Sequence, residues 1–166
     1  MNVRTIQNVP LRLRGSSLFT KGRTEIRGEI IMYKSDFAKL NTERREKGEP
    51  EYANPRNLAA GTIRQLDPKL VASRPLRFKA YDLLREDPEE VPTNMYAYEQ
   101  LREMGVSVNK EATVFTELED VMSFIDSWDT KRHDLPYLMD GLVVKVNDRA
   151  LFTQLGVVGK QPRGAI

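Results

Sequence analysis

Three apolar segments that favour β-strands, far apart in the sequence, constrain the fold of this chain most strongly. Thr24–Tyr33 alternates in polarity, Leu76–Leu84 is typical of a second strand, and Leu138–Val146 predicts a third, buried strand. Helical stretches lie between them. This order predicts an α+β fold with a mixed, largely antiparallel sheet and flanking helices. The length of 166 residues suits one domain.

Further helices and short strands are predicted around these three segments. Ser35 can cap a helix that runs to about Lys47, with apolar residues spaced along one face. Pro55 fits the first turn of a second helix that continues to about Leu66. The other predictions are a helix capped by Thr93 through Met104, a capping box at Thr116-x-x-Glu119, a helix at Arg149–Leu155, and short strands at Val9–Leu13 and Thr113–Phe115.

The helix that follows Thr116 carries one apolar stripe. Its members are Leu118, Val121, Met122, Ile125 and Trp128. Their spacing matches one face of an α-helix, which predicts that they are core residues and disfavours a ligand-binding stripe.

The residue types that the chain lacks exclude several kinds of site. Cysteine is absent, which excludes disulfides, cysteine-ligated zinc and a thiol nucleophile. His133 is the only histidine, so histidine-rich metal sites are excluded, and no nucleophile-elbow motif accompanies it. No long apolar run predicts a membrane span, and the first residues lack the apolar stretch of a signal peptide. A cytoplasmic protein without membrane partners is therefore expected.

Charge is distributed unevenly, although the net charge is only +2. Residues 1–81 carry 17 basic and 8 acidic side chains, whereas residues 82–130 carry 3 basic and 13 acidic ones. A basic half beside an acidic middle suggests that one surface faces a polyanion. The alternative is chance clustering on a solvated surface.

The segment Ile26–Ile31 is the first of four whose composition points to a site. Alternation places Arg27 and Glu29 on one face of the predicted strand, and Gly28 permits close approach of a ligand or another backbone. The alternative is an exposed strand face with an Arg–Glu pair.

The segment Tyr52–Pro68 is the second. Arg56 and Arg64 are eight positions apart, so they share a side of the predicted helix. Two guanidinium groups beside a helix start would suit a phosphate ester. The alternative is that both arginines solvate the surface.

The third and fourth segments lie in the later strands. In Phe78–Asp82, alternation turns Phe78, Ala80 and Asp82 one way and Lys79 and Tyr81 the other, where the tyrosine can stack on a base or cover the sheet. In the last strand, Asp140 and Lys145 interrupt the apolar run. A lysine there needs an anionic partner, such as a nucleotide phosphate, or the solvent access of an edge strand.

Together these segments resemble the adenylation domain of bacterial NAD-dependent DNA ligases. Six strings carry the resemblance in order: NVRTIQNVPLRL, IRGEI, YANPRNLAAGTIRQLDP, RPLRFKAY, LPYLMDGLVVKVND and LGVVGKQPRGAI. The second is similar to motif III, the fifth to motif IV and the last to the lead-in to motif V, and the third is the most specific. The resemblance implies a partial adenylation domain over residues 1–166, with the nucleotidyltransferase fold of DNA ligases and mRNA capping enzymes.

The resemblance also implies an activity. In this family, an active-site lysine attacks the α-phosphate of NAD and releases nicotinamide mononucleotide. The lysine-linked AMP moves to the 5′-phosphate at a nick, and the 3′-hydroxyl then displaces it. The implied cofactors are NAD, which supplies AMP, and Mg²⁺. The implied partners are nicked double-stranded DNA and the remaining domains of the ligase.

Residue roles follow from the matching motifs. Glu29 would hold the AMP ribose, Tyr81 would stack on adenine, and Lys145 would contact the nucleotide from the opposite strand. Asp140 would support the site beside motif IV. No residue is predicted to bind a metal ion directly.

Three arginines would contact phosphate by the same resemblance. Arg56 and Arg64 would serve the nick phosphate and the DNA backbone. Arg132 would make another contact on the phosphate side.

The chain also departs from the family pattern. None of its ten lysines lies in the Lys-x-Asp-Gly motif of the nucleophile, the motif V lysine is expected shortly after Ile166, and Gly164 replaces a common tryptophan. The chain alone is therefore expected neither to ligate DNA nor to become adenylylated. The leading interpretation is a fragment of the ligase. The alternatives are a non-catalytic nucleotide- or DNA-binding relic and a generic basic nucleic-acid module.

Overall fold

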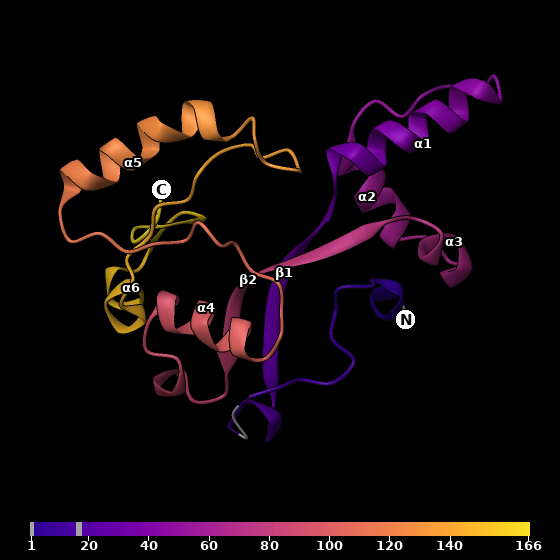
Figure 1. Cartoon of the computed structure of the whole chain (residues 1–166). Helices are drawn as coiled ribbons and strands as arrows, with labels where there is room; N and C mark the ends of the chain where they lie inside the picture. Colours follow the sequence, from indigo (N-terminus) through magenta and orange to yellow (C-terminus); the bar gives the residue numbers. More distant parts are fainter. Residues whose placement is uncertain (1, 16–17) are drawn as a thin grey trace.

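Two long antiparallel strands form the main sheet of the computed structural model, which describes residues 2–15 and 18–166 (Figure 1). Strand β1 covers Thr24–Met32 and β2 covers Leu76–Arg85, as the sequence predicted to within one residue at each end. A second, short hairpin of β3 (Val157–Val158) and β4 (Gln161–Pro162) was not predicted. The α+β class with antiparallel pairing is confirmed.

A β-bulge interrupts the β1–β2 ladder near its middle. The register passes from Arg27 opposite Asp82 to Gly28 opposite Ala80, so Tyr81 is the extra residue on β2. The bulge shifts the side-chain alternation, and both Ala80 and Leu83 are buried. The prediction that Asp82 continues the face of Ala80 is therefore wrong, because it assumed an unbroken period of two.

Three helices follow β1. Helix α1 covers Lys34–Glu46, α2 covers Pro55–Ile63 and α3 covers Pro68–Ala72. Tyr33, not Ser35, occupies the N-cap of α1 and makes no side-chain capping bond. Helix α2 starts at Pro55 as predicted but ends at Ile63, before Leu66. The unpredicted α3 follows because Asp67 caps a new helix through the backbone N–H of Lys69, with Pro68 at its first position.

Two hydrophobic clusters flank the sheet. Helix α4 (Asn94–Glu103), capped by Thr93 through the N–H of Tyr96 as predicted, packs on β2. Its cluster contains Phe19, Ala80, Leu83, Val91, Ala97, Leu101, Met104, Val106 and Val108. The second cluster joins the ends of the strands to α2 and α3 and contains Ile6, Met32, Ala59, Val71 and Leu76. Phe78 packs against both clusters, which places it at their junction.

Helix α5 (Leu118–Lys131) departs most from its predicted role. Its N-cap is Glu117, with no side-chain capping bond, so the capping box at Thr116 is wrong. Of the predicted core stripe, Trp128 is 6% exposed, but Leu118 is 69% and Met122 53% exposed. Val121 and Ile125 are partly buried. Figure 1 shows α5 above the C-terminal segment and away from the two long strands, so the apolar face is only partly covered.

Three predicted strands lack regular strand structure. Val9–Leu13 and Thr113–Phe115 are irregular. Leu138–Val146 makes one β-bridge, from Lys145 to Ala165, and Val144 exchanges two 2.9 Å backbone hydrogen bonds with Ile166. Apolar, β-branched composition makes a strand possible, but a ladder also needs a partner backbone, which local sequence does not specify.

The last helix, α6, covers Arg149–Leu155 as predicted and is capped by Asp148. Within the described ranges, none of the helices combines the length and apolar character needed to cross a membrane.

Candidate functional site

A cavity of about 930 Å³ lies against the middle of the main sheet. Residues of β1 and β2 line one side, residues 138–147 line another, and Val121, Phe124, Ile125 and Trp128 of α5 contribute an apolar wall. Five of the seven residues predicted from the sequence line this cavity: Glu29, Arg56, Tyr81, Asp140 and Lys145. Arg64 and Arg132 lie elsewhere. Elements far apart in the chain therefore bring most of the predicted site together.

Arg56 connects two carboxylates across the cavity. Asn54 caps α2 by accepting a 2.7 Å hydrogen bond from the N–H of Arg56, which fixes this residue in the first turn. Its Nε lies 3.3 Å from Oε1 of Glu29, and its Nη1 pairs with Asp140. All three side chains are at least half exposed, so these ion pairs are weak and can exchange partners with a ligand.

Gly28 allows a close approach of two strands beside the cavity. A Cβ atom at this position would lie 2.4 Å from the ring of Phe78 and 2.5 Å from the carbonyl oxygen of Lys79. The sequence left open whether a ligand or a backbone approaches this glycine, and the structure places the neighbouring strand there. On the same strand, Arg27 bonds to Glu25 at 2.7 Å, so the Arg–Glu pair left open for Arg27 and Glu29 does not form.

Tyr81 projects from the bulge into this site and is 51% exposed. A half-exposed aromatic ring on a cavity wall is available for stacking. Lys79, two residues earlier, also lines the cavity; the sequence placed it on the face of Tyr81 but gave it no role in the site. Its Nζ donates to the carbonyl oxygen of Val108 at 3.3 Å and lies 5.1 Å from the ring centroid of Tyr137, while partial burial lowers its pKa. Alternation along β2 places Lys79 on the same face as Tyr81, and this was the signal in the sequence for a lysine that faces the cavity.

Lys145 is a cation in a partly buried position. Burial lowers its pKa from the ordinary value of 10.5, the charge of Asp82 opposes this effect, and Arg149 adds to it. An anion in the cavity would favour the charged form of Lys145 and so bind against it. The sequence required either an anionic partner or solvent access for this lysine, and its intermediate burial is compatible with both.

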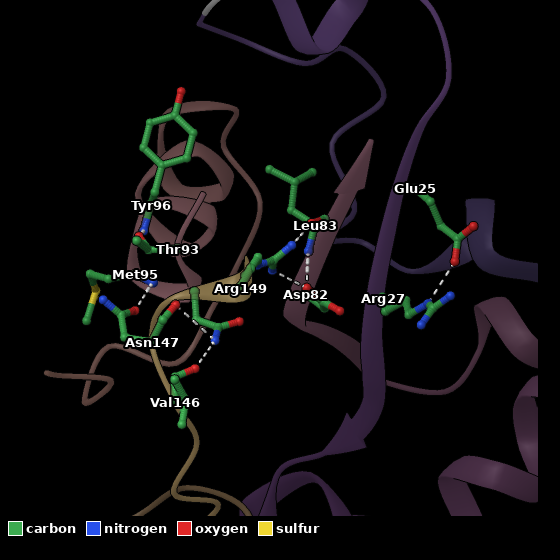
Figure 2. A network of polar contacts seen from close by, with 11 residues as sticks. Glu25, Arg27, Asp82, Leu83, Thr93, Met95, Tyr96, Val146, Asn147 and Arg149 are labelled. Atoms are coloured by element: carbon green, nitrogen blue, oxygen red, sulfur yellow. Dashed lines mark hydrogen bonds and ion pairs between the residues drawn. The ribbon is translucent and has the colours of Figure 1, made fainter. Parts of the chain in front are cut away.

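A polar network holds the segment after Lys145 in place (Figure 2). The side chain of Asn94 donates to the carbonyl oxygen of Val146 at 2.8 Å, and the N–H of Met95 donates to Oδ1 of Asn147 at 2.9 Å. Arg149 reaches from the start of α6 to β2, where it pairs with Asp82. This network was not predicted, because asparagine and arginine beside a strand carry no signal of their partners.

The two remaining arginines take surface positions. Arg64 is the C-cap of α2, and its Nε donates at 3.0 Å to the carbonyl oxygen of Ala60 in the same helix. Arg132 is the C-cap of α5 and is exposed. The structure therefore does not unite Arg56 and Arg64 in one pocket, although both remain accessible to a large ligand.

The acidic side chains in the described part of the chain form no metal cage of their own. Among the residues that the structure describes, no group of three or more His, Cys, Asp or Glu side chains could hold a metal ion. Glu29 and Asp140 both pair with Arg56. A magnesium ion here would depend on oxygen ligands from a bound phosphate, as is usual for this cation.

Comparisons with known proteins give a consistent result over the whole chain. The model of the family described as the NAD-dependent DNA ligase adenylation domain matches residues 1–166. The DNA ligase of Halothermothrix orenii is 46% identical over 165 residues, and that of Thermomicrobium roseum is 46% identical over 166. The DNA ligase of Shouchella clausii is 42% identical over 164 residues. Each alignment covers 99% of this chain but only 24% of the relative.

Proposed function

The chain belongs to the NAD-dependent DNA ligase adenylation domain family, and from this membership we propose that its cavity binds the AMP moiety of NAD during DNA nick joining. The observation that carries the proposal is the convergence of Glu29, Tyr81 and Lys145 on one cavity. They come from β1, β2 and the segment before α6. The family match also removes the alternative of a generic basic module without ligase ancestry.

Each of the three residues suits a different part of AMP. The exposed ring of Tyr81 stacks on adenine, since base–aromatic stacking needs a free face and no particular base edge. The carboxylate of Glu29 accepts hydrogen bonds from the ribose hydroxyls. Lys145 contacts the nucleotide from the opposite wall, where an anionic phosphate compensates for the partial burial of its ammonium group.

The arginines and Asp140 serve the phosphate side. Arg56 exchanges its two exposed ion pairs for a phosphate oxygen, and Arg64 and Arg132 contact the DNA backbone from the surface. Asp140 supports the site beside Lys145. Mg²⁺, which the oxygens of a bound phosphate would hold, would offset negative charge there.

The complete reaction belongs to the longer ligase, of which this chain matches 24% of the length. In it, a lysine nitrogen bonds to the α-phosphate of NAD as nicotinamide mononucleotide leaves. The AMP then passes to the 5′-phosphate of the nick and frees the lysine. The 3′-hydroxyl finally bonds to that phosphate, loses its proton and expels AMP. None of the lysines in this sequence lies in a Lys-x-Asp-Gly motif, so this chain contributes nucleotide and phosphate contacts.

Titration of the chain with AMP, followed by two-dimensional amide NMR, tests this proposal. We expect saturable shifts around Glu29, Tyr81 and Lys145, because these residues line the cavity. Guanosine monophosphate is the matched control, and weaker saturation by this nucleotide would show adenine preference. A dispersed spectrum that AMP leaves unchanged would contradict nucleotide binding by this chain.

The pKa of Lys145 gives a second expected result. Burial makes its ammonium group titrate below 10.5 in the free chain, and bound AMP is expected to raise that pKa because phosphate favours the charged form. The pH dependence of the ¹³Cε chemical shift of Lys145 measures both values. A midpoint at or above 10.5 without AMP, or a fall of the midpoint with AMP, would contradict this account.

The same shift has a consequence for stability. Between the lowered pKa and 10.5, the unfolded chain binds more protons at Lys145 than the folded chain does, so the free energy of unfolding rises with pH in that window. Lys79 acts with the same sign. The difference between the wild type and Lys145→Met, measured by urea unfolding across this window, isolates the contribution of Lys145.

A further inference from the structure

We propose that Arg149 is a positioning residue that fixes Tyr81 and Lys145 relative to each other across the cavity. The inference rests on the proposed function, because it concerns the geometry of the same nucleotide site. It adds a residue that lies outside the cavity lining and to which the motif resemblance assigned no role.

The side chain of Arg149 binds β2 at Asp82 and Leu83, the two residues that follow Tyr81. One guanidinium nitrogen, Nη1, donates to the carbonyl oxygen of Leu83 at 2.7 Å, and Nη2 pairs with Oδ1 of Asp82 (Figure 2). Oδ1 of Asp82 also accepts a 2.9 Å hydrogen bond from the N–H of Leu83. The side chains of Arg149 and Asp82 are only 20% and 23% exposed, so solvent screens this pair less than the surface pairs.

The bulge explains why Tyr81 needs such an anchor. At a β-bulge the ladder is locally disrupted, and the extra residue takes its direction from the residues on either side. On one side of Tyr81, the N–H of Ala80 donates to the carbonyl oxygen of Ser107 at 2.8 Å. On the other side, the guanidinium group of Arg149 binds Asp82 and the carbonyl oxygen of Leu83. These two anchors set the direction in which the Tyr81 ring leaves the strand.

The backbone of Arg149 continues the segment that carries Lys145, and residues at the start of α4 hold this stretch in place. The N–H of Arg149 donates to the carbonyl oxygen of Pro92 at 3.0 Å, and the preceding Asn147 accepts from Met95 at 2.9 Å. Lys145 lies four residues before Arg149, and its backbone bridges to Ala165. The connection from Lys145 to the bulge therefore runs through a short, hydrogen-bonded stretch of chain and one arginine side chain.

Electrostatics supports the same proximity. The charges of Asp82 and Arg149 both act on the pKa of Lys145, in opposite directions. The ion pair between Arg149 and Asp82, which holds the bulge, therefore also lies close enough to Lys145 to influence its charge. Loss of Arg149 would leave a partly buried carboxylate without its partner and free the bulge to change direction.

Arg85, the last residue of β2, supplies a matched control. It pairs with Glu90 at 2.5 Å and donates to Oγ1 of Thr24 at 2.7 Å, with a side chain only 9% exposed. Like Arg149, it holds β2 through its guanidinium group, and it is more deeply buried than Arg149. It lies at the far end of the strand and does not line the cavity. If Arg149 only stabilised the fold, its replacement and the replacement of Arg85 would have the same effect on the site.

The test compares Arg149→Gln, Arg149→Lys and Arg85→Gln in the 166-residue chain, with two measurements. The first is the position of the Tyr81 aromatic and Lys145 ¹³Cε signals without ligand. The second is the dissociation constant of AMP. We expect Arg149→Gln to move both signals and to weaken AMP binding about tenfold or more, because small displacements of binding groups are costly. Arg149→Lys keeps the charge but loses the fork, so it should restore part of the affinity.

Arg85→Gln should lower the melting temperature yet leave both signals and the affinity for AMP unchanged. Unmoved Tyr81 and Lys145 signals in Arg149→Gln, or equal movement in Arg85→Gln, would overturn the inference. If Arg149→Gln does not fold, Arg149→Lys gives the same comparison. If the wild type fails to bind AMP, the proposed function fails, and the ligand-free signals alone decide whether Arg149 positions the two residues.

Discussion

Replacement of Gly28 with alanine is expected to destabilise the chain by about 3 kcal/mol, the upper part of the usual range for overpacking. The added methyl group would lie 2.4 Å from the Phe78 ring and 2.5 Å from the carbonyl oxygen of Lys79. The ring cannot withdraw freely, because it packs against both hydrophobic clusters. The backbone of Phe78 is also held by two 2.8 Å hydrogen bonds to the side chain of Asn8. Urea unfolding would measure the loss as a lower midpoint with an unchanged slope.

Gly61→Ala is the matched control for this substitution. Gly61 lies inside α2, and a Cβ atom there would meet nothing within 4 Å. Alanine should therefore stabilise the helix by about 0.5–1 kcal/mol, since glycine loses more conformational freedom on folding. If Gly28→Ala were tolerated as well as Gly61→Ala, the close approach of β1 and β2 would not be a requirement of the fold.

Replacement of Tyr81 with alanine is expected to weaken AMP binding roughly 5- to 150-fold, as removal of one base-stacking ring costs about 1–3 kcal/mol. Tyr81 is half exposed at the bulge, so its removal should change the free energy of unfolding by no more than about 0.5 kcal/mol. Isothermal titration calorimetry with AMP measures the first quantity, and urea unfolding measures the second. The combination separates a binding role from a structural one.

Tyr81→Phe is the control that keeps the ring. It should bind AMP nearly as the wild type does, because stacking depends on the aromatic face and not on the hydroxyl group. Equal affinity in Tyr81→Ala and the wild type would exclude adenine stacking by this residue. A loss in Tyr81→Phe as large as in Tyr81→Ala would assign the contribution to the hydroxyl group instead.

Local signals in the sequence predicted the elements that depend on local chemistry. The polar alternation of β1, the Pro55 start of α2 and the Thr93 cap of α4 are confirmed, because each reflects a preference of a few neighbouring residues. The bulge at Tyr81 was not predicted, since it depends on how two distant strands align. The same limitation explains why the strand predicted at Leu138–Val146 is wrong over most of its length. Its composition favours a strand, but only its C-terminal end pairs with another backbone segment.

The same distinction, between local signals and long-range contacts, applies to the residues of the candidate site. Motif resemblance identified five residues that the structure places around one cavity, and their roles toward AMP and DNA stay predictions. It did not identify Lys79 or Arg149, whose importance depends on burial and on partners far away in the sequence. Leu118 and Met122 were predicted to be core residues but are exposed. Helical periodicity predicts an apolar face, but it does not predict whether another element covers that face.

The pairing of β1 with β2 has a consequence for the time course of folding. Paired residues lie 44 to 61 positions apart, from Met32 with Leu76 to Thr24 with Arg85, and α1, α2 and α3 lie between them. At about 5–20 residues per second of synthesis, β1 emerges several seconds before its partner strand exists. The intervening helices can form first from local contacts and shorten the loop that must close. A nascent chain therefore displays an unpaired, isoleucine-rich strand during those seconds, when its free edge can pair with another chain.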